Sequence, residues 1–239
     1  LAKLERAHER LVVVDDDNHN IASARNSSVE HASGDVVFHQ LDADDRYLRG
    51  LRDFARLFEA LEAHYDRPVY LRGRNVHLAR RETLRSVPYR DVGYGEDLDL
   101  WRRMTASDDV EMVWLNHRPV REQIGYGRDI LGYIGVRYST VRVQFRTGIR
   151  PASYVRCMVE ELFPWGVDSR PWYGAVFHLL VTPFAYLSVR GERLEDGELP
   201  PAYRDYCRYR KHVIGAVTSV PELREAGVDS APEDLDDPE

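Results

Sequence analysis

Apolar and polar positions alternate along the first half of the chain in a way that predicts strands and helices in turn. Segments rich in apolar residues at 11–14 (LVVV) and 35–41 (DVVFHQL) predict buried strands, and 110–116 (VEMVWLN) predicts a further strand. The segment 75–87 predicts a strand that passes into a helical turn, and the remaining helical spacing covers 2–10, 20–32, 47–65 and 95–106. This alternation predicts an α/β fold.

Beyond about residue 150 the alternation stops, and the pattern predicts a mostly helical C-terminal extension. Residues 172–189 (WYGAVFHLLVTPFAYLSV) carry no charge and contain Pro183, which interrupts a helix. One interpretation is a helix, or a broken pair of helices, buried against the first domain or in a homodimer. The other is an element at a membrane surface, where the surrounding arginines would meet anionic lipid.

These patterns divide the chain into a core at 1–125, a helical extension at 126–220 and an acidic tail at 221–239. The tail holds eight acidic residues, three prolines and a single arginine, so we expect it to be solvated and disordered. The whole chain has 33 basic and 40 acidic residues, a net charge of −7, so the tail carries the excess. The remainder is near neutral and gives no reason to expect a nucleic-acid partner.

The basic residues are nearly all arginine, which together with the acidic tail indicates a GC-rich, halophilic source. Cys157 and Cys207 are too few for a disulfide framework or a cysteine-based zinc site, so a reducing interior is expected. The first residues, LAKLERAHER, lack the apolar core of a signal peptide. We therefore expect a cytoplasmic protein, with peripheral attachment to the inner face of the membrane as the alternative.

An acidic cluster follows the strand predicted at 35–41. In open α/β sheets ligands bind beyond the carboxyl ends of the strands, where Asp42, Asp44 and Asp45 stand. Carboxylates at this spacing can hold a hard divalent cation, whose charge removes their mutual repulsion. The cluster therefore predicts a site for Mg²⁺ or Mn²⁺, and a solvated acidic turn is the alternative.

A second acidic pair, Glu96 and Asp97, opens the helix predicted at 95–106. A carboxylate at a helix N-terminus is stabilised as the anion by the helix dipole. Taken alone, the pair could be ordinary first-turn acids. Taken with the aspartate cluster, it adds a candidate general base to a candidate metal anchor, which is enough for a metal-assisted transfer reaction.

Two segments resemble the family-2 glycosyltransferases of the GT-A fold. Residues 20–45, NIASARNSSVEHASGDVVFHQLDADD, resemble that family's A-R-N helix, A-x-G-D turn, apolar strand and L-D-A-D-D motif. Residues 94–104, YGEDLDLWRRM, resemble its E-D helix, at a similar distance along the chain. The resemblance covers roughly residues 2–125 and implies a GT-A-like, Rossmann-like mixed sheet.

The resemblance implies roles for the residues of the donor site. Asp42 would contact the nucleotide ribose or the metal, and Asp44 would hold Mg²⁺ or Mn²⁺ on the diphosphate. Asp45 would support the loop. Arg25 and Asn26 match the A-R-N motif and would lie near the nucleotide, with helix packing and capping as their alternative role.

The resemblance also implies roles for the second motif. Asp97 matches the catalytic base of inverting members, Glu96 would orient the acceptor or the loop, and Arg103 matches the arginine that follows the E-D pair. Other candidates are less specific. His117 and the segment 121–123 lie where relatives place a contact to metal or phosphate.

Arg72 and Arg74 could also approach a phosphate or an acceptor. Arginine is, however, the usual cation of this chain, so the sequence assigns these two residues no role.

The implied function is an inverting, metal-assisted transfer of a sugar from a nucleotide-diphosphate sugar to a hydroxyl of a glycan, lipid-linked or protein-linked acceptor. A non-catalytic interaction module and a sugar-phosphate nucleotidyltransferase are the alternatives. In this family a strand, a helix and a base-reading aspartate strand precede the A-R-N helix. Asp15 to Asp17 stand only about ten positions before Asn26, so we expect about 40 to 60 further residues before Leu1.

Overall fold

A five-stranded mixed sheet lies at the centre of the computed structural model, in the order β1-β4-β3-β5-β7. The structure describes residues 20–39, 45–47, 50–73, 76–116, 121–123, 130–163, 172–192, 194, 200–215 and 217–228. Strands β1 (Val36–His39), β3 (Val69–Arg72), β5 (Glu111–Asn116) and β7 (Val217–Ser219) are parallel, and β4 (His77–Arg80) is antiparallel to β1 and β3. The α/β fold expected from the sequence is confirmed at this level.

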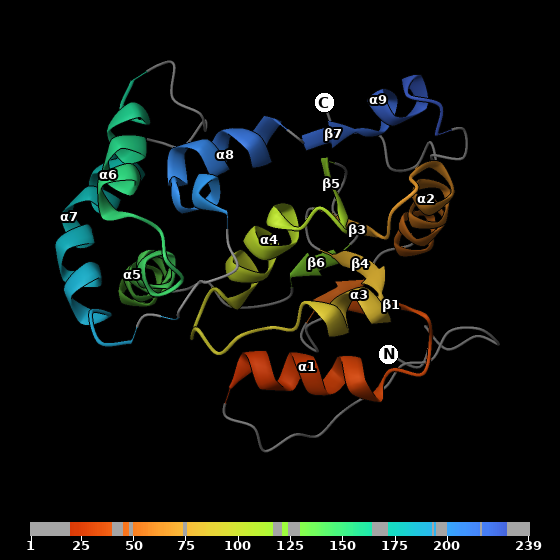
Figure 1. Ribbon diagram of the computed structural model, residues 1–239, viewed down its shortest axis with the longest axis horizontal. Coiled ribbons are helices and arrows are strands. Elements are labelled where there is room, and N and C mark those ends of the chain that lie inside the picture. The colour runs from red at the N-terminus through yellow and green to blue at the C-terminus, as the bar shows by residue number, and fades with distance from the viewer. Residues whose placement is uncertain are drawn as a thin grey trace.

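Helices cover both faces of the sheet (Figure 1). One face packs against α2 (Leu51–His64) and α9 (Val220–Glu225), and the other against α1 (Ile21–His31), α3 (Arg81–Ser86) and α4 (Glu96–Ala106). Beside the sheet gather α5 (Ile130–Arg146), α6 (Pro151–Glu160), α7 (Trp172–Ser188), the short 3-10 helix η1 (Pro201–Arg204) and α8 (Tyr206–Gly215). The mostly helical character of the second half is therefore confirmed.

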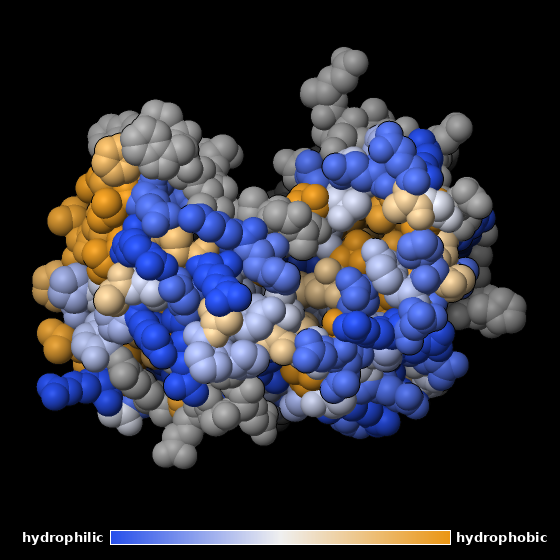
Figure 2. Space-filling model, turned by 45° about the horizontal axis from the view of Figure 1, so that its top comes forward, coloured by the Kyte–Doolittle hydropathy of each residue, from blue (hydrophilic) through white to orange (hydrophobic). Residues whose placement is uncertain are grey.

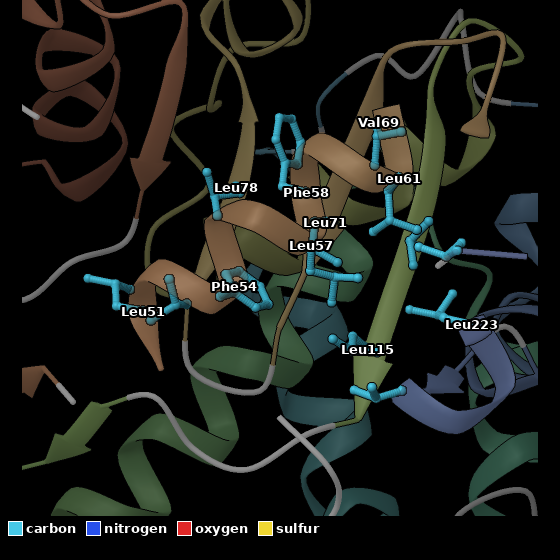
Figure 3. Packing of buried hydrophobic residues seen from close by; sticks show 14 residues of the cluster. Leu51, Phe54, Leu57, Phe58, Leu61, Val69, Leu71, Leu78, Leu115 and Leu223 are labelled. Carbon is cyan, nitrogen blue, oxygen red and sulfur yellow. The ribbon is translucent and has the colours of Figure 1, made fainter. Parts of the chain in front are cut away.

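Helix α2 shows how the sequence pattern becomes packing. Its apolar residues recur every three or four positions, which places them on one face of the helix. The leucines and phenylalanines of the helix are all buried against the sheet (Figure 3): Leu51, Phe54, Leu57, Phe58 and Leu61. Burying a leucine or phenylalanine side chain fully stabilises the fold by about 1.5–3 kcal/mol, so this stripe contributes a large share of the core.

Strand β3 carries the alternation that separates the core from the candidate site. Val69 and Leu71 point toward α2 and α9, and Tyr70 packs with α1 and α4 on the other face. Because successive side chains of a strand point to opposite faces, Arg72 lies on the same face as Tyr70. Arg72 is therefore a charged residue on the face of the sheet that α4 covers.

Several details differ from the sequence-based expectation. The helix expected at 47–65 begins only at Leu51, because Asp45–Tyr47 forms a short strand, β2, paired with β6 (Arg121–Gln123). Strand β3 was not anticipated. Neither was β7, which pairs with β5 and so extends the core sheet from beyond residue 216.

The tail also differs from the expectation, because regular secondary structure continues past residue 221. Helix α9 is capped by Ser219 and Glu222 in a capping box, and Leu223 and Val228 are buried in the core. A disordered tail from residue 221 is therefore wrong as far as Val228. Residues 229–239, and the helix and strand predicted at 2–10 and 11–14, lie outside the described residues.

The uncharged stretch at 172–189 forms the single helix α7, with Pro183 inside it. One side packs into the helical cluster, where Ala185 is buried, and α7 lies against α5 and α6. The other side is exposed, with Leu180 and Phe184 at 67% and 68% of their full accessibility. Among the helices that the structure describes, none is both long and apolar enough to cross a membrane.

Candidate active site

Helix α4 presents the acidic pair at its N-terminus. Gly95 adopts a φ of 105°, in the left-handed region that glycine tolerates, and this turns the chain into the helix. The backbone N–H of Gly95 donates to Glu96 Oε2 at 2.9 Å, and that of Leu98 donates to Asp97 Oδ1 at 2.8 Å. Backbone donors thus hold both carboxylates at the positive end of the helix dipole.

Glu96 joins the two motifs found in the sequence. It is buried and forms an ion pair with Arg25 of α1, which also lies 5.3 Å from the ring of Tyr89. Burial raises the pKa of Glu96 above its ordinary value, although Arg25 opposes this shift. The A-R-N helix and the E-D helix therefore meet through Arg25 and Glu96.

Asn26 fixes the segment that leads into α4. Its Nδ2 donates to the carbonyl of Tyr89 and its Oδ1 accepts from the N–H of Tyr89, both at 2.9 Å. This pair of bonds imitates a strand pairing and ties α1 to the loop 87–95. Asn26 thus has a positioning role here, and the nucleotide contact expected for it stays a prediction.

Arg103 belongs to a buried charge cluster around Asp99. It donates to Asp99 at 3.0 Å and to the carbonyl of Pro88, while Arg90 donates to both oxygens of Asp99 and Arg102 lies 3.8 Å away. Burial alone would raise the pKa of Asp99, but the three arginines lower it below its ordinary value. The cluster anchors the loop before α4, and a role of Arg103 toward the donor stays a prediction.

Asp97 opens onto a cavity of about 270 Å³ between the sheet and the C-terminal helices. The sheet contributes Arg72 and Trp114 and α4 contributes Trp101, while the opposite wall includes Arg137 of α5 and Arg210 of α8. The helical extension therefore completes the wall that faces the candidate base. Sequence reasoning assigned no role to these lining residues, because they come together from five separate elements.

Arg72 is the central side chain of this cavity. The strand register places His39, His77, Arg72 and Trp114 in one row across β1, β4, β3 and β5. The guanidinium carbon of Arg72 lies 3.4 Å from the ring centroid of Trp101 and 3.4 Å from that of Trp114. Its signal in the sequence is the run VYLR between Pro68 and Gly73, typical of a short buried strand that ends in a charge.

His39 belongs to the same row of cross-strand neighbours, two strands away from Arg72. Its Nδ1 is 2.8 Å from the hydroxyl of Tyr89, and its ring lies 5.2 Å from that of Tyr70 and 5.5 Å from that of His77. Burial, with a smaller effect of Arg25, lowers the pKa of His39 to about 3. The imidazole is therefore neutral in the folded protein at any pH near neutrality.

The lowered pKa of His39 leads us to expect that the stability of the fold depends on pH. Because its folded pKa lies below the unfolded value of 6.5, only the unfolded chain takes up a proton as the pH falls below 6.5. Stability should fall by up to about 1.4 kcal/mol per pH unit per proton. Urea unfolding at pH 7.0, 6.0 and 5.0 should show a flatter slope for His39→Gln than for the unchanged chain. The exposed control His64→Gln should keep the slope, and an unchanged slope in His39→Gln would contradict this assignment.

The aspartate cluster stands at the edge of the described region. Asp42 and Asp44 lie outside the described residues, and Asp45 opposes Gln123 where β2 pairs with β6. The pairing brings 121–123 beside the acidic motif. Within the described ranges, no group of three His, Cys, Asp or Glu side chains is arranged to hold a metal ion. Metal binding by Asp42 and Asp44 therefore stays a prediction.

A larger hollow of about 510 Å³ lies elsewhere, between α2, the start of β3 and α3. Its wall includes Glu62 and Arg80, which pair with each other at 2.6 Å. None of the motif residues lines it. The smaller cavity at Asp97 is therefore the candidate active site.

Comparison with known proteins adds no assignment. The scan against protein-family models, the search of curated proteins and the search of solved structures each found no match to this chain.

Proposed function

We propose that the protein is an inverting glycosyltransferase with a GT-A-like core, which moves a sugar from a nucleotide-diphosphate sugar to a hydroxyl acceptor. The observation that carries this proposal is the position of Asp97. Its carboxylate opens α4, lines a cavity of about 270 Å³ and makes no ion pair within the described residues. An unpaired, partly exposed carboxylate in a cavity suits a general base.

The arrangement around Asp97 supports this role. Glu96, its neighbour, is engaged with Arg25, so the two acids have different surroundings. Asp99 is fixed by three arginines, which excludes it from proton transfer with a substrate in the cavity. Of these three carboxylates, only Asp97 lines the cavity.

We infer the following chemistry for this site. Asp97 takes the proton of the acceptor hydroxyl while the hydroxyl oxygen forms a bond to the anomeric carbon of the donor sugar. The bond from that carbon to the nucleoside diphosphate breaks, and configuration inverts in one displacement. A divalent cation, Mg²⁺ or Mn²⁺, would be held by Asp42 and Asp44 and would neutralise the charge of the departing diphosphate.

The test is the release of product from nucleotide-sugars. The full chain is incubated with UDP-, GDP- and dTDP-sugars, with and without Mg²⁺ or Mn²⁺, and the nucleoside diphosphate and pyrophosphate are quantified. Release of nucleoside diphosphate with transfer supports the proposal. Release of pyrophosphate would favour a nucleotidyltransferase, and neither product would favour a non-catalytic module.

We also propose that the exposed side of α7 rests on an anionic membrane. Apolar side chains gather at the left edge of the molecule in Figure 2, on the side of α6 and α7. The exposed ones are Val155, Val159, Leu162 and Phe163 on α6 and in the turn after it, and Tyr173, Leu180, Phe184 and Leu187 on α7. Exposed Arg190 follows α7, and an apolar face bordered by arginine suits a lipid surface.

Vesicle binding checks this surface. We expect the protein to sediment with vesicles containing one third phosphatidylglycerol, and the double change Leu180→Glu and Phe184→Glu to lower binding at least about tenfold, because it removes apolar burial. The matched control is Ala63→Glu with Ala226→Glu, which adds the same two negative charges at exposed positions away from α6 and α7. If the protein does not bind the vesicles and instead dimerises through this face, the result contradicts the membrane proposal and favours the homodimer.

A further inference from the structure

The surroundings of Arg72 limit how a ligand can contact its guanidinium. Its guanidinium carbon lies over the indole rings of both Trp101 and Trp114, 3.4 Å from each ring centroid, so the two indoles cover it as cation–π partners. A guanidinium covered by two indoles in this way meets a ligand through its N–H groups. Those groups form the planar fork that matches a carboxylate or phosphate.

The charge of Arg72 has no partner in the described part of the chain. No hydrogen bond or ion pair joins Arg72 to these residues, and its Nε is buried without an acceptor. Burial lowers the pKa of Arg72 to about 10, so the side chain is still charged near neutral pH. Burying a charge costs desolvation free energy unless a group of opposite charge pairs with it. For Arg72, an anionic group can reach the guanidinium through the cavity.

The rest of the cavity favours an anion as well. Arg137 and Arg210 line it with Arg72, and among the described residues of its wall Asp97 is the single acidic one. Tyr206 and Tyr209 add phenol groups from α8. Three arginines therefore line the described wall of the cavity beside one candidate base.

The place of Arg72 in the sheet separates it from the predicted donor motif. Asp42 follows the end of β1, while Arg72 ends β3, and β4 lies between these two strands. Adjacent strands lie about 4.8 Å apart, so β1 and β3 are separated by roughly 10 Å.

We propose that Arg72, held between Trp101 and Trp114, binds the anionic group of the acceptor, so that the acceptor is a sugar bearing a carboxylate or a phosphate ester. This inference rests on the proposed function, because Asp97 identifies the cavity as the place of the acceptor hydroxyl. The fork of Arg72 fixes the acidic group, which orients the acceptor for Asp97. Neutral sugars lack the group that this fork recognises.

The two indoles supply a direct readout that requires no turnover. The chain has four tryptophans, so Trp165→Phe with Trp172→Phe leaves only the pair around Arg72 as tryptophan fluorophores, which are excited selectively over tyrosine. This double variant is titrated at constant ionic strength with D-glucuronate, D-glucose 6-phosphate and D-glucose. We expect a saturable change of fluorescence with either or both anions, which distinguishes the carboxylate from the phosphate, and none with glucose.

Variants in the same background assign the effect to the guanidinium. Arg72→Gln should weaken anion binding about tenfold or more, because hydrogen bonds to a charged group are lost. Arg72→Lys keeps the charge but not the fork and should weaken binding less. The control Arg208→Gln, on the exposed side of α8, should stay within about twofold. Circular dichroism establishes that each variant is folded before titration.

Three results would overturn the proposal. The first is a double variant whose fluorescence shows no saturable change with either anion. This result does not depend on any substitution at Arg72. The second is equal affinity in the folded Arg72→Gln protein. The third is competition by UDP or GDP without metal, since this would assign the anion site to the donor. A protein that binds glucuronate through Arg72 but never turns over a nucleotide-sugar would refute glycosyl transfer and leave the anion site standing.

Discussion

Replacement of Asp97 by asparagine should lower sugar transfer by at least about 10²-fold while leaving donor binding intact. The amide keeps the size of the side chain but cannot take the proton of the acceptor hydroxyl, and a positioned base contributes about 10²- to 10⁴-fold. Leu98 N–H can still donate to the side-chain oxygen that remains. We therefore expect the helix start and the cavity to persist.

The measurement combines turnover with calorimetric titration of nucleoside diphosphate. Asp91→Asn, an exposed aspartate in the loop before α4, serves as the control for loss of one negative charge. It should change turnover by less than about twofold. If Asp97→Asn retains full turnover, the base is elsewhere, and Glu96 is the next residue to replace.

Replacement of Asp99 by asparagine should destabilise the fold by about 3–5 kcal/mol. Asp99 and Arg102 are each only 1% exposed, and Arg90 and Arg103 also donate to this carboxylate. Asparagine at this position has no charge to meet the arginines around it, and breaking a buried charge pair in this way has effects of that size. Because single domains are stable by only about 5–15 kcal/mol, the variant should unfold at markedly lower denaturant concentration.

Urea or guanidinium unfolding of the purified chain measures this loss. The control is Asp53→Asn, which removes an exposed pair with Arg56 at 3.1 Å and should change stability by less than about 1 kcal/mol. The effect of Asp99 should also shrink on acidification. Its folded pKa is lowered, so its contribution is present above the ordinary value of 3.8 and is lost as the pH falls through the folded pKa. Equal midpoints for the two variants at neutral pH would contradict the role of the cluster.

Helices α1, α2 and α4 show what local pattern can predict. Asn20 caps α1 by accepting from Ala22 N–H, and Gly95 opens α4, both within two residues of the expected starts. These signals are local, because a cap or an amphipathic stripe depends on neighbours within one or two turns. The end of α2 was predicted for the same reason. Its start was not, because the pairing of β2 with β6 depends on residues more than seventy positions away.

The candidate site divides in the same way. Glu96 and Asp97 were recognised as a motif because they are adjacent and open a helix. Arg103 belongs to the same motif, yet its contacts to Asp99 and Pro88 became visible only with the loop in place. Arg25 was expected near a nucleotide, and its ion pair with Glu96 could not be read from the chain, since α1 and α4 meet only when the sheet is formed.

By itself, the sequence determined the α/β class, the helical second half and the acidic residues at the start of α4, because each depends on periodicity or on short-range chemistry. Only the tertiary structure decided that β7 returns to the sheet, that α5 and α8 wall the cavity, and that Arg72 lies between two tryptophans. Those features join residues from distant parts of the chain. An arginine has the same local signal whether it meets water or two indoles, so its surroundings are set by packing.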